Sequence, residues 1–178
     1  LRNVIRKIFG LMPTTRPGII PSYSNGRSSF PPNGKIYEVE HFMGGISTFK
    51  KDLFDKISFS PFFKGYGLYE DFDLCVRSLK YGKLYVDTNA KIWHFHDAGG
   101  RTNDFLYGKK VIINGWYVWR LKFPDPTVGS RVKWHLTALV LMSIRLINAI
   151  TGPNHSSGFK EFLGRSAGLF CLIFKKPQ

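Results

Sequence analysis

The chain has 178 residues, of which 43% are hydrophobic and 16% aromatic. This composition supplies enough apolar surface for a folded core and excludes a disordered chain. Lysine and arginine total 26 against 12 acidic residues, for a formal net charge of +14. A protein with this positive charge favours anionic partners, such as phosphorylated ligands, nucleic acid or acidic membrane surfaces. Two cysteines, Cys75 and Cys171, make no disulfide framework, so we expect a reducing compartment.

The charge is unevenly distributed along the chain. Residues 1–35 hold six bases and no acid, and residues 101–178 hold twelve bases and three acids. Residues 36–100 instead hold nine acids and eight bases. The carboxylates are therefore concentrated in the middle of the chain, between two cationic flanks.

The first third of the chain predicts a loop followed by short elements. Prolines and glycines interrupt the backbone between Arg16 and Gly34, so we expect a long loop there. Alternating polarity from Ile36 to Phe42 predicts a strand, which the Gly44-Gly45 pair ends. A short strand at Ile46–Phe49 and a helical turn or two at Lys51–Ile57 are expected next.

The segment Glu70–Tyr81 has the clearest helical pattern. Its apolar residues recur at three- and four-residue spacing, at Phe72, Cys75, Val76 and Leu79. Asp73 stands one turn before Arg77, the spacing at which an ion pair forms on a helix. Acidic residues at the start and Gly82 after the end match the helix dipole and the usual stop signal.

The later elements are two strands and three helices. The strands are expected at Lys83–Val86 and Lys91–His96, and the helices at Thr102–Phe123, Arg131–Ile150 and Phe159–Phe174. The sequence thus predicts a mixed α/β architecture, with strands and short helices in residues 1–101 and a basic, aromatic-rich, amphipathic helical tail in residues 102–178.

The second helix of this tail has two interpretations. The apolar run Leu136–Ile144 is shorter than the ~20 residues of a membrane span, and Lys133 and Arg145 flank it. An amphipathic helix lying on a membrane surface fits the pattern, and so does a helix packed on the core. The sequence leaves both open.

Two adjacent carboxylates, Glu70 and Asp71, open the clearest helix, directly after the Gly65-Tyr66-Gly67 loop. Backbone N–H groups and the helix dipole favour an ionised carboxylate at this position, which suits a proton acceptor. Helix capping explains the same acids without any function.

The segment from Ile92 to His96 places two histidines, His94 and His96, on one face of the expected strand. Trp93 and Phe95 take the opposite face, which we expect to be buried. Two imidazoles on one face can bind a divalent metal, and the glycine-containing turn that ends in Arg101 can close over a phosphate.

The run Phe42–Arg101 resembles the C-terminal half of the catalytic domain of inverting glycosyltransferase family 2, of the GT-A type. The shared features are a small-residue turn, a basic or aromatic stretch, a Gly/Tyr loop, an acidic pair opening a helix, an arginine, a glycine, a strand and a histidine. Here they are Gly44-Gly45, Phe49-Lys50-Lys51, Gly65-Tyr66-Gly67, Glu70-Asp71-Phe72-Asp73-Leu74, Arg77, Gly82, Lys83–Val86 and Ala90–His94. The resemblance implies a partial GT-A (Rossmann-like) fold with a mixed sheet.

The resemblance also implies a role for the acids and the histidines. Asp71 would be the general base that takes the proton from the acceptor sugar hydroxyl, and Glu70 would support the same pocket. His94, with His96 in reserve, would complete the coordination of a Mg²⁺ or Mn²⁺ ion that neutralises the departing nucleotide diphosphate.

The remaining matching residues would contact the donor. Gly44 and Gly45 would let the backbone approach the donor sugar, and Arg101 would contact the diphosphate. The implied activity is inverting transfer of a sugar from a nucleotide-sugar donor to a glycan or lipid-linked acceptor. We expect a protein peripheral to the cytoplasmic face of the cell membrane, with an anionic membrane surface and no nucleic acid among its partners.

The family's nucleotide-binding half has no counterpart in this sequence. Family members begin with an apolar strand and hold the metal with an Asp-x-Asp, whereas the Asp-x-Asp of this chain, Asp71-Phe72-Asp73, belongs to a helix. The chain begins at Leu1 without a leader-like segment. We therefore expect a fragment that needs an N-terminal half for turnover.

Two rival functions stay open. One is a non-catalytic basic module that binds an anionic membrane or nucleic acid through the cationic, aromatic tail. The other is a metal-dependent hydrolase built on His94, His96 and Asp71, which gives the Gly/Tyr loop and Arg77 no purpose.

Overall fold

The computed structural model describes Val4, Lys7, residues 15–24, residues 30–93, Phe95, residues 103–175 and Pro177. The chain divides into two compact units. The helical unit comprises Leu1–Pro13, Ser22–Ser24 and Arg101–Gln178, and the sheet unit comprises Thr14–Pro21 and Asn25–Gly100. The described residues contain α-helices and a small antiparallel sheet, so the expectation of a mixed α/β fold is confirmed at this level.

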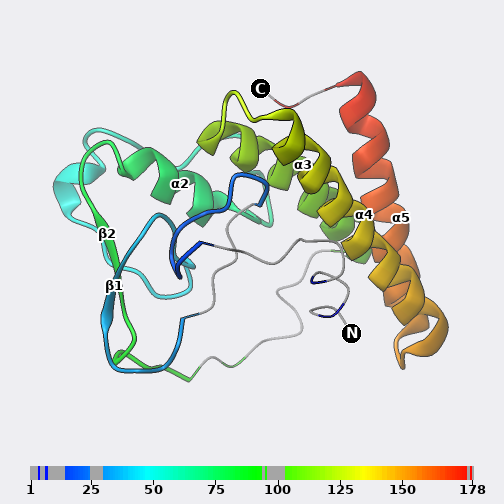
Figure 1. The fold of residues 1–178 in the computed structure, drawn as a ribbon, viewed down its shortest axis with the longest axis horizontal. Helices are drawn as coiled ribbons and strands as arrows, with labels where there is room; N and C mark the ends of the chain where they lie inside the picture. Colours follow the sequence, from blue (N-terminus) through cyan, green and yellow to red (C-terminus); the bar gives the residue numbers. More distant parts are fainter. Residues whose placement is uncertain are drawn as a thin grey trace. The chain divides into compact units, whose positions relative to one another are not determined.

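Two strands form the sheet of the sheet unit (Figure 1). β1 (Ile36–Val39) pairs antiparallel with β2 (Leu84–Asp87), and Val39 lies opposite Leu84. Both residues are buried together with Cys75. The two strands lie where the alternation predicts them, although β1 ends earlier than expected.

The helix with the clearest sequence pattern is α2 (Glu70–Ser78). Its side chains Phe72 and Cys75 are fully buried, as the three-residue spacing predicts. Residues 79–81 form a turn, so α2 is shorter than expected. Upstream, η1 (Lys51–Leu53) is a single 3-10 turn within the expected helical segment.

The predicted strand Ile46–Phe49 is wrong, because this segment has no strand conformation. Of the expected strand Lys91–His96, the described residues Lys91–Trp93 and Phe95 have no strand conformation, and His94 and His96 lie outside the described residues. β1 with β2 makes the one ladder among the described residues. A strand requires a partner for its backbone N–H and C=O groups, and alternation alone does not reveal whether a partner exists. Trp93 and Phe95, expected to be buried, are 89% and 88% exposed.

The helical unit contains α3 (Asp104–Lys122), α4 (Val128–Thr151) and α5 (His155–Phe174), where three helices are expected. The Asn103 side chain accepts hydrogen bonds from the first free N–H groups of α3, and Thr127 does the same for α4. These caps satisfy donors that have no partner within the helix. α4 and α5 begin earlier than predicted.

Glycines bring α3 and α5 into backbone contact. A Cβ on Gly164 would lie 2.0 Å from the Phe105 carbonyl oxygen, and a Cβ on Gly108 would lie 2.3 Å from the Glu161 carbonyl oxygen. Because no side chain fits at either position, these glycines are what allows the two helix backbones to approach this closely.

Three tryptophans form the core of the helical unit. The ring centroid of Trp116 lies 5.1 Å from those of Trp119 and Trp134. The buried indole N–H of Trp119 donates to the Ser22 carbonyl oxygen at 2.8 Å. A buried indole N–H requires such a partner, so this bond ties Ser22–Ser24 to the helices.

One face of α4 is packed on this core. Trp134 and Ala138 are 5% and 6% exposed, as the core-packed interpretation predicts. However, only 11% of the most apolar 18-residue window of α4 is buried, at a mean hydropathy of 1.3. By length and composition alone, α4 could cross a membrane, although its central apolar run is short.

Candidate functional site

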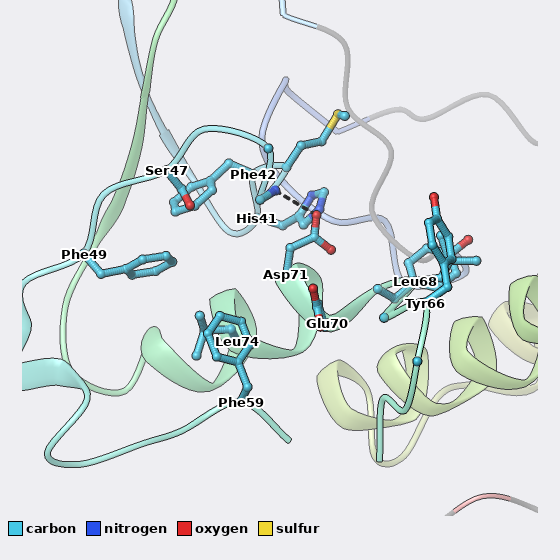
Figure 2. A pocket seen from close by; sticks show the side chains of 16 residues that line it. His41, Phe42, Ser47, Phe49, Phe59, Tyr66, Leu68, Glu70, Asp71 and Leu74 are labelled. Carbon is cyan, nitrogen blue, oxygen red and sulfur yellow. Dashed lines mark hydrogen bonds between the residues drawn. The ribbon is translucent and has the colours of Figure 1, made fainter. Parts of the chain in front are cut away.

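A cavity of about 890 Å³ lies in the sheet unit beside the start of α2 (Figure 2). Its walls come from the segment after β1, the loop before α2 and the first turns of α2. The lining residues include His41, Phe42, Gly44, Gly45, Ser47, Phe49, Phe59, Tyr66, Leu68, Glu70, Asp71 and Leu74. The volume lies within the ~300–1,000 Å³ of ordinary small-molecule sites.

Asp71 stands at the edge of this cavity, half-buried in the first turn of α2. Its Oδ2 accepts a hydrogen bond from the Gly44 N–H at 2.9 Å, and its Oδ1 accepts one from the Phe72 N–H at 2.8 Å. A carboxylate has about four lone-pair positions, so both oxygens can still accept a further hydrogen bond.

Glu70 occupies the neighbouring position and is exposed. Its carboxylate lies so close to Gly67 that a Cβ there would come within 2.2 Å of Oε2. Tyr69, the residue before the helix, has φ of 74°, in the left-handed region. This conformation costs about 1–2 kcal/mol for a residue with a Cβ, and such strain concentrates at functional sites.

The Gly44-Gly45 turn faces the same cavity. A Cβ on Gly44 would lie 3.1 Å from the Asp71 Cβ, so a larger residue would press on the carboxylate. The structure therefore brings Gly44, Gly45, Glu70 and Asp71 together.

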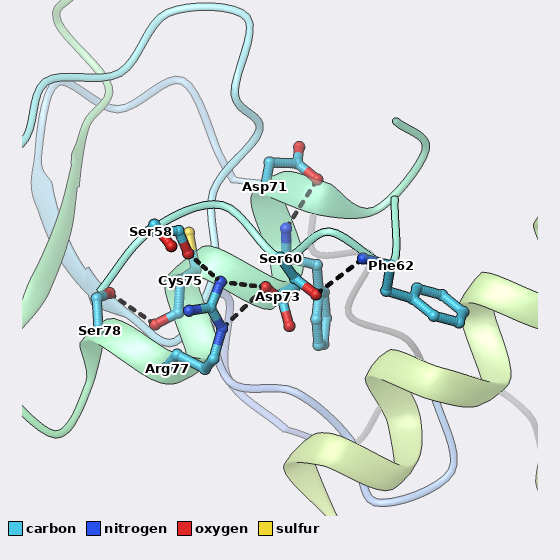
Figure 3. A network of polar contacts seen from close by, with 9 residues as sticks. Ser58, Ser60, Phe62, Asp71, Asp73, Cys75, Arg77 and Ser78 are labelled. Atoms are coloured by element: carbon cyan, nitrogen blue, oxygen red, sulfur yellow. Dashed lines mark hydrogen bonds and ion pairs between the residues drawn. The ribbon is translucent and has the colours of Figure 1, made fainter. Parts of the chain in front are cut away.

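An ion pair between a buried carboxylate and a half-buried guanidinium fixes one wall of the cavity to α2 (Figure 3). The predicted pair between Asp73 and Arg77 is present, with Arg77 Nε donating to Asp73 Oδ2 at 2.9 Å. Arg77 also donates to the Ser58 carbonyl oxygen at 2.8 Å. Since Phe59 lines the cavity, Arg77 holds the backbone that positions this ring.

Four phenylalanine rings, three of which line the cavity, contact one another in succession. The Phe42 and Phe49 centroids lie 5.5 Å apart, Phe49 and Phe54 5.8 Å, and Phe54 and Phe59 6.2 Å. Figure 2 labels Phe49, Phe59 and Leu74 among the side chains that line the cavity. These rings offer flat apolar surface to a ligand whose polar groups reach the carboxylates.

Cys75 does not supply a nucleophile to this site. The thiol is fully buried and donates to the Phe42 carbonyl oxygen at 3.8 Å. Burial raises its pKa to about 11, with a smaller contribution from the negative charge of Asp71. The thiol is therefore protonated at neutral pH, and a thiol is a weak nucleophile compared with a thiolate.

The predicted metal and phosphate ligands lie outside the described residues. These are His94, His96 and Arg101. Within the ranges that the structure describes, no group of three metal-ligating side chains converges. The assignment of Mg²⁺ or Mn²⁺ to this chain therefore stays a prediction.

Sequence reasoning misses several lining residues, namely His41, Ser47, Phe59 and Leu68. The His41 ring packs at a tilt against Phe72, with ring centroids 4.9 Å apart, which buries part of the imidazole. The alternating pattern could have placed His41 at the strand end. No local signal marks Phe59, because the loop that holds it is positioned by Arg77.

Comparison with known proteins identified no relative of this chain. No protein-family model, no curated protein and no solved structure matches this chain. The resemblance to glycosyltransferase family 2 therefore stays a prediction that rests on the motifs of residues 42–101.

Proposed function

We propose that the sheet unit is the acceptor side of an inverting glycosyltransferase, part of a GT-A-like catalytic domain. The observation that supports it best is the Asp71 carboxylate, held by the N–H groups of Gly44 and Phe72 at the edge of a ligand-sized cavity. Transfer of a sugar to an acceptor hydroxyl requires a proton acceptor that is held in a fixed orientation.

In the proposed reaction, Asp71 accepts the proton of the acceptor hydroxyl while the hydroxyl oxygen bonds to the anomeric carbon of the donor. The bond from this carbon to the diphosphate breaks, and its electron pair leaves with the diphosphate. Attack from the side opposite the leaving group inverts the anomeric configuration. A positioned general base contributes roughly 10²–10⁴ to the rate.

The other cavity residues would orient the acceptor. Glu70 lies next to the base and can accept hydrogen bonds from neighbouring hydroxyls of a sugar. The rings of Phe49 and Phe59 would contact the apolar face of a sugar ring or an attached lipid. A glycan or lipid-linked acceptor matches both parts of this lining.

The donor side of the proposal rests on the resemblance alone. Gly44 and Gly45 would admit the donor sugar, and Arg101 would contact the diphosphate of the nucleotide-sugar. His94, with His96 in reserve, would hold Mg²⁺ or Mn²⁺, which when bound offsets negative charge on the leaving group.

The experiment compares Asp71→Asn with Asp55→Asn in the full-length protein, using a panel of nucleotide sugars and glycoside acceptors. Asp55 is exposed and lies outside the cavity lining, so it is a matched control. We expect Asp71→Asn to lower kcat by about 10²-fold or more, the share of a general base, with the donor Kd nearly unchanged. Asp55→Asn should match the wild type. Near-wild-type turnover by Asp71→Asn would refute the assignment.

A further inference from the structure

α4 has an exposed apolar stripe on the face opposite its packed side chains. The stripe consists of Val128, Val132, Leu139, Ile147 and Ile150, which are 77%, 52%, 44%, 38% and 68% exposed. At 100° per residue these positions fall within about a quarter of the helix circumference. We call this set the α4 stripe.

α5 has a comparable exposed set, which we call the α5 patch. It consists of Phe159, Leu163, Phe170, Ile173 and Phe174, all at least 40% exposed and again on one face of the helix. α4 and α5 pack side by side in the helical unit (Figure 1). Exposed apolar sets of this extent on two neighbouring helices indicate an interaction surface on a protein.

The charges around these residues are of one sign. From Val128 to Lys175 the chain has six bases and a single acid, Glu161. Glu161 is 6% exposed, and its carboxylate is paired with Arg145 at 3.0 Å and with Arg165. The exposed charges of α4 and α5 are therefore all cationic, and they include Lys133 and Lys160.

The packing of α3 on α5 distinguishes two ways of binding a membrane, namely crossing the bilayer and lying in its surface. α3 contacts α5 backbone to backbone through Gly108 and Gly164, and it carries Lys109, Lys110, Arg120 and Lys122. If α5 crossed the bilayer, α3 would have to enter the hydrocarbon with these charges, which is unfavourable. Insertion of α4 and α5 at the surface leaves α3 in water.

We propose that the helical unit binds an anionic lipid bilayer in the plane of its surface. The α4 stripe and the α5 patch enter the boundary between headgroups and acyl chains, and the exposed bases contact lipid phosphates. This inference goes beyond the proposed function, since it concerns residues of the helical unit, whereas Asp71 belongs to the sheet unit, and it stands whether or not Asp71 is a base.

The experiment measures cosedimentation of the full chain with vesicles of phosphatidylcholine, with and without phosphatidylglycerol. We compare Leu139→Glu/Ile147→Glu with a control, Ile46→Glu/Ile92→Glu, whose residues are exposed on the sheet unit. We expect tighter binding to anionic vesicles, a loss of about tenfold or more in the stripe variant, and a change within about twofold in the control. Alkaline carbonate should release the bound protein.

A second variant tests the charges separately from the apolar contact. Lys160→Glu/Lys175→Glu should weaken binding to anionic vesicles, and added salt should have the same effect on the wild type. Four results would overturn the proposal: no vesicle binding, equal binding by the stripe variant, resistance to carbonate, or a dimer in solution that the stripe variant dissociates. Binding of single-stranded RNA more tightly than vesicles would also overturn it.

Discussion

The contact between α3 and α5 makes a sharp prediction for stability. Gly164→Ala and Gly129→Ala both replace a helical glycine, and each gains up to about 1 kcal/mol of helix propensity. At Gly129 a Cβ meets nothing within 4 Å, whereas at Gly164 it would lie 2.0 Å from the Phe105 carbonyl oxygen and 3.0 Å from the Lys109 nitrogen. The substitution at Gly164 therefore requires the helices to separate.

The expected change in the free energy of unfolding is the difference between the overpacking cost and the gain in helix propensity. Overpacking costs about 1–3 kcal/mol when the neighbours can move, and more when the obstacle is backbone. We expect Gly164→Ala to lower the free energy of unfolding by roughly 2 kcal/mol or more after the propensity gain, and Gly129→Ala to raise it slightly. The first change corresponds to a fall in Tm of roughly 4–8 °C for a chain of this size.

Helical circular dichroism during urea and thermal unfolding measures both variants. If Gly164→Ala proved as stable as Gly129→Ala, the helices would not pack at the separation described above. The argument that α3 keeps α5 out of the bilayer would then lose its basis.

Three further predictions concern the sheet unit. Asp73→Ala should destabilise it by about 1–3 kcal/mol, because the Arg77 guanidinium and its hydrogen bonds lose their partner, whereas Lys83→Ala at an exposed pair should cause no measurable change in urea unfolding. The raised pKa of Cys75, about 11 against 9.0, means that only the unfolded thiol ionises between these values. Wild-type stability should therefore fall by roughly 2 kcal/mol from pH 9 to 11 relative to Cys75→Ala, and a parallel pH dependence in the two proteins would contradict this. Gly67→Ala should displace the Glu70 carboxylate and lower kcat/KM by roughly 10- to 100-fold. Gly82→Ala, where an added Cβ has no atom within 4 Å, should leave kcat/KM unchanged.

The spacing of residues within each segment predicts the helices and one ion pair. The spacing of Asp73 and Arg77 predicts their contact, because residues four apart on a helix are neighbours whatever surrounds them. The three C-terminal helices follow from proline and glycine boundaries in the same way. These features depend on few residues beyond the segment that contains them.

Features that depend on distant residues could not be predicted. The bond from the Gly44 N–H to Asp71 joins residues 27 positions apart, and nothing in either segment specifies it. Alternation around Trp93 and Phe95 predicts a buried face, but both side chains are exposed because no strand pairs with this segment among the described residues. Whether an alternating segment becomes a strand is decided by its partner.

The central claim is that the cavity beside Asp71 binds a sugar acceptor, and amide chemical-shift mapping of the isotope-labelled chain tests it directly. Titration with glycosides should shift the Glu70 and Asp71 amide signals, which belong to the cavity residues proposed to receive the acceptor. Phe59→Ala, which removes an aromatic wall, should weaken the binding. Glycosides that leave these amides unchanged, or that shift only signals elsewhere in the chain, would contradict the account.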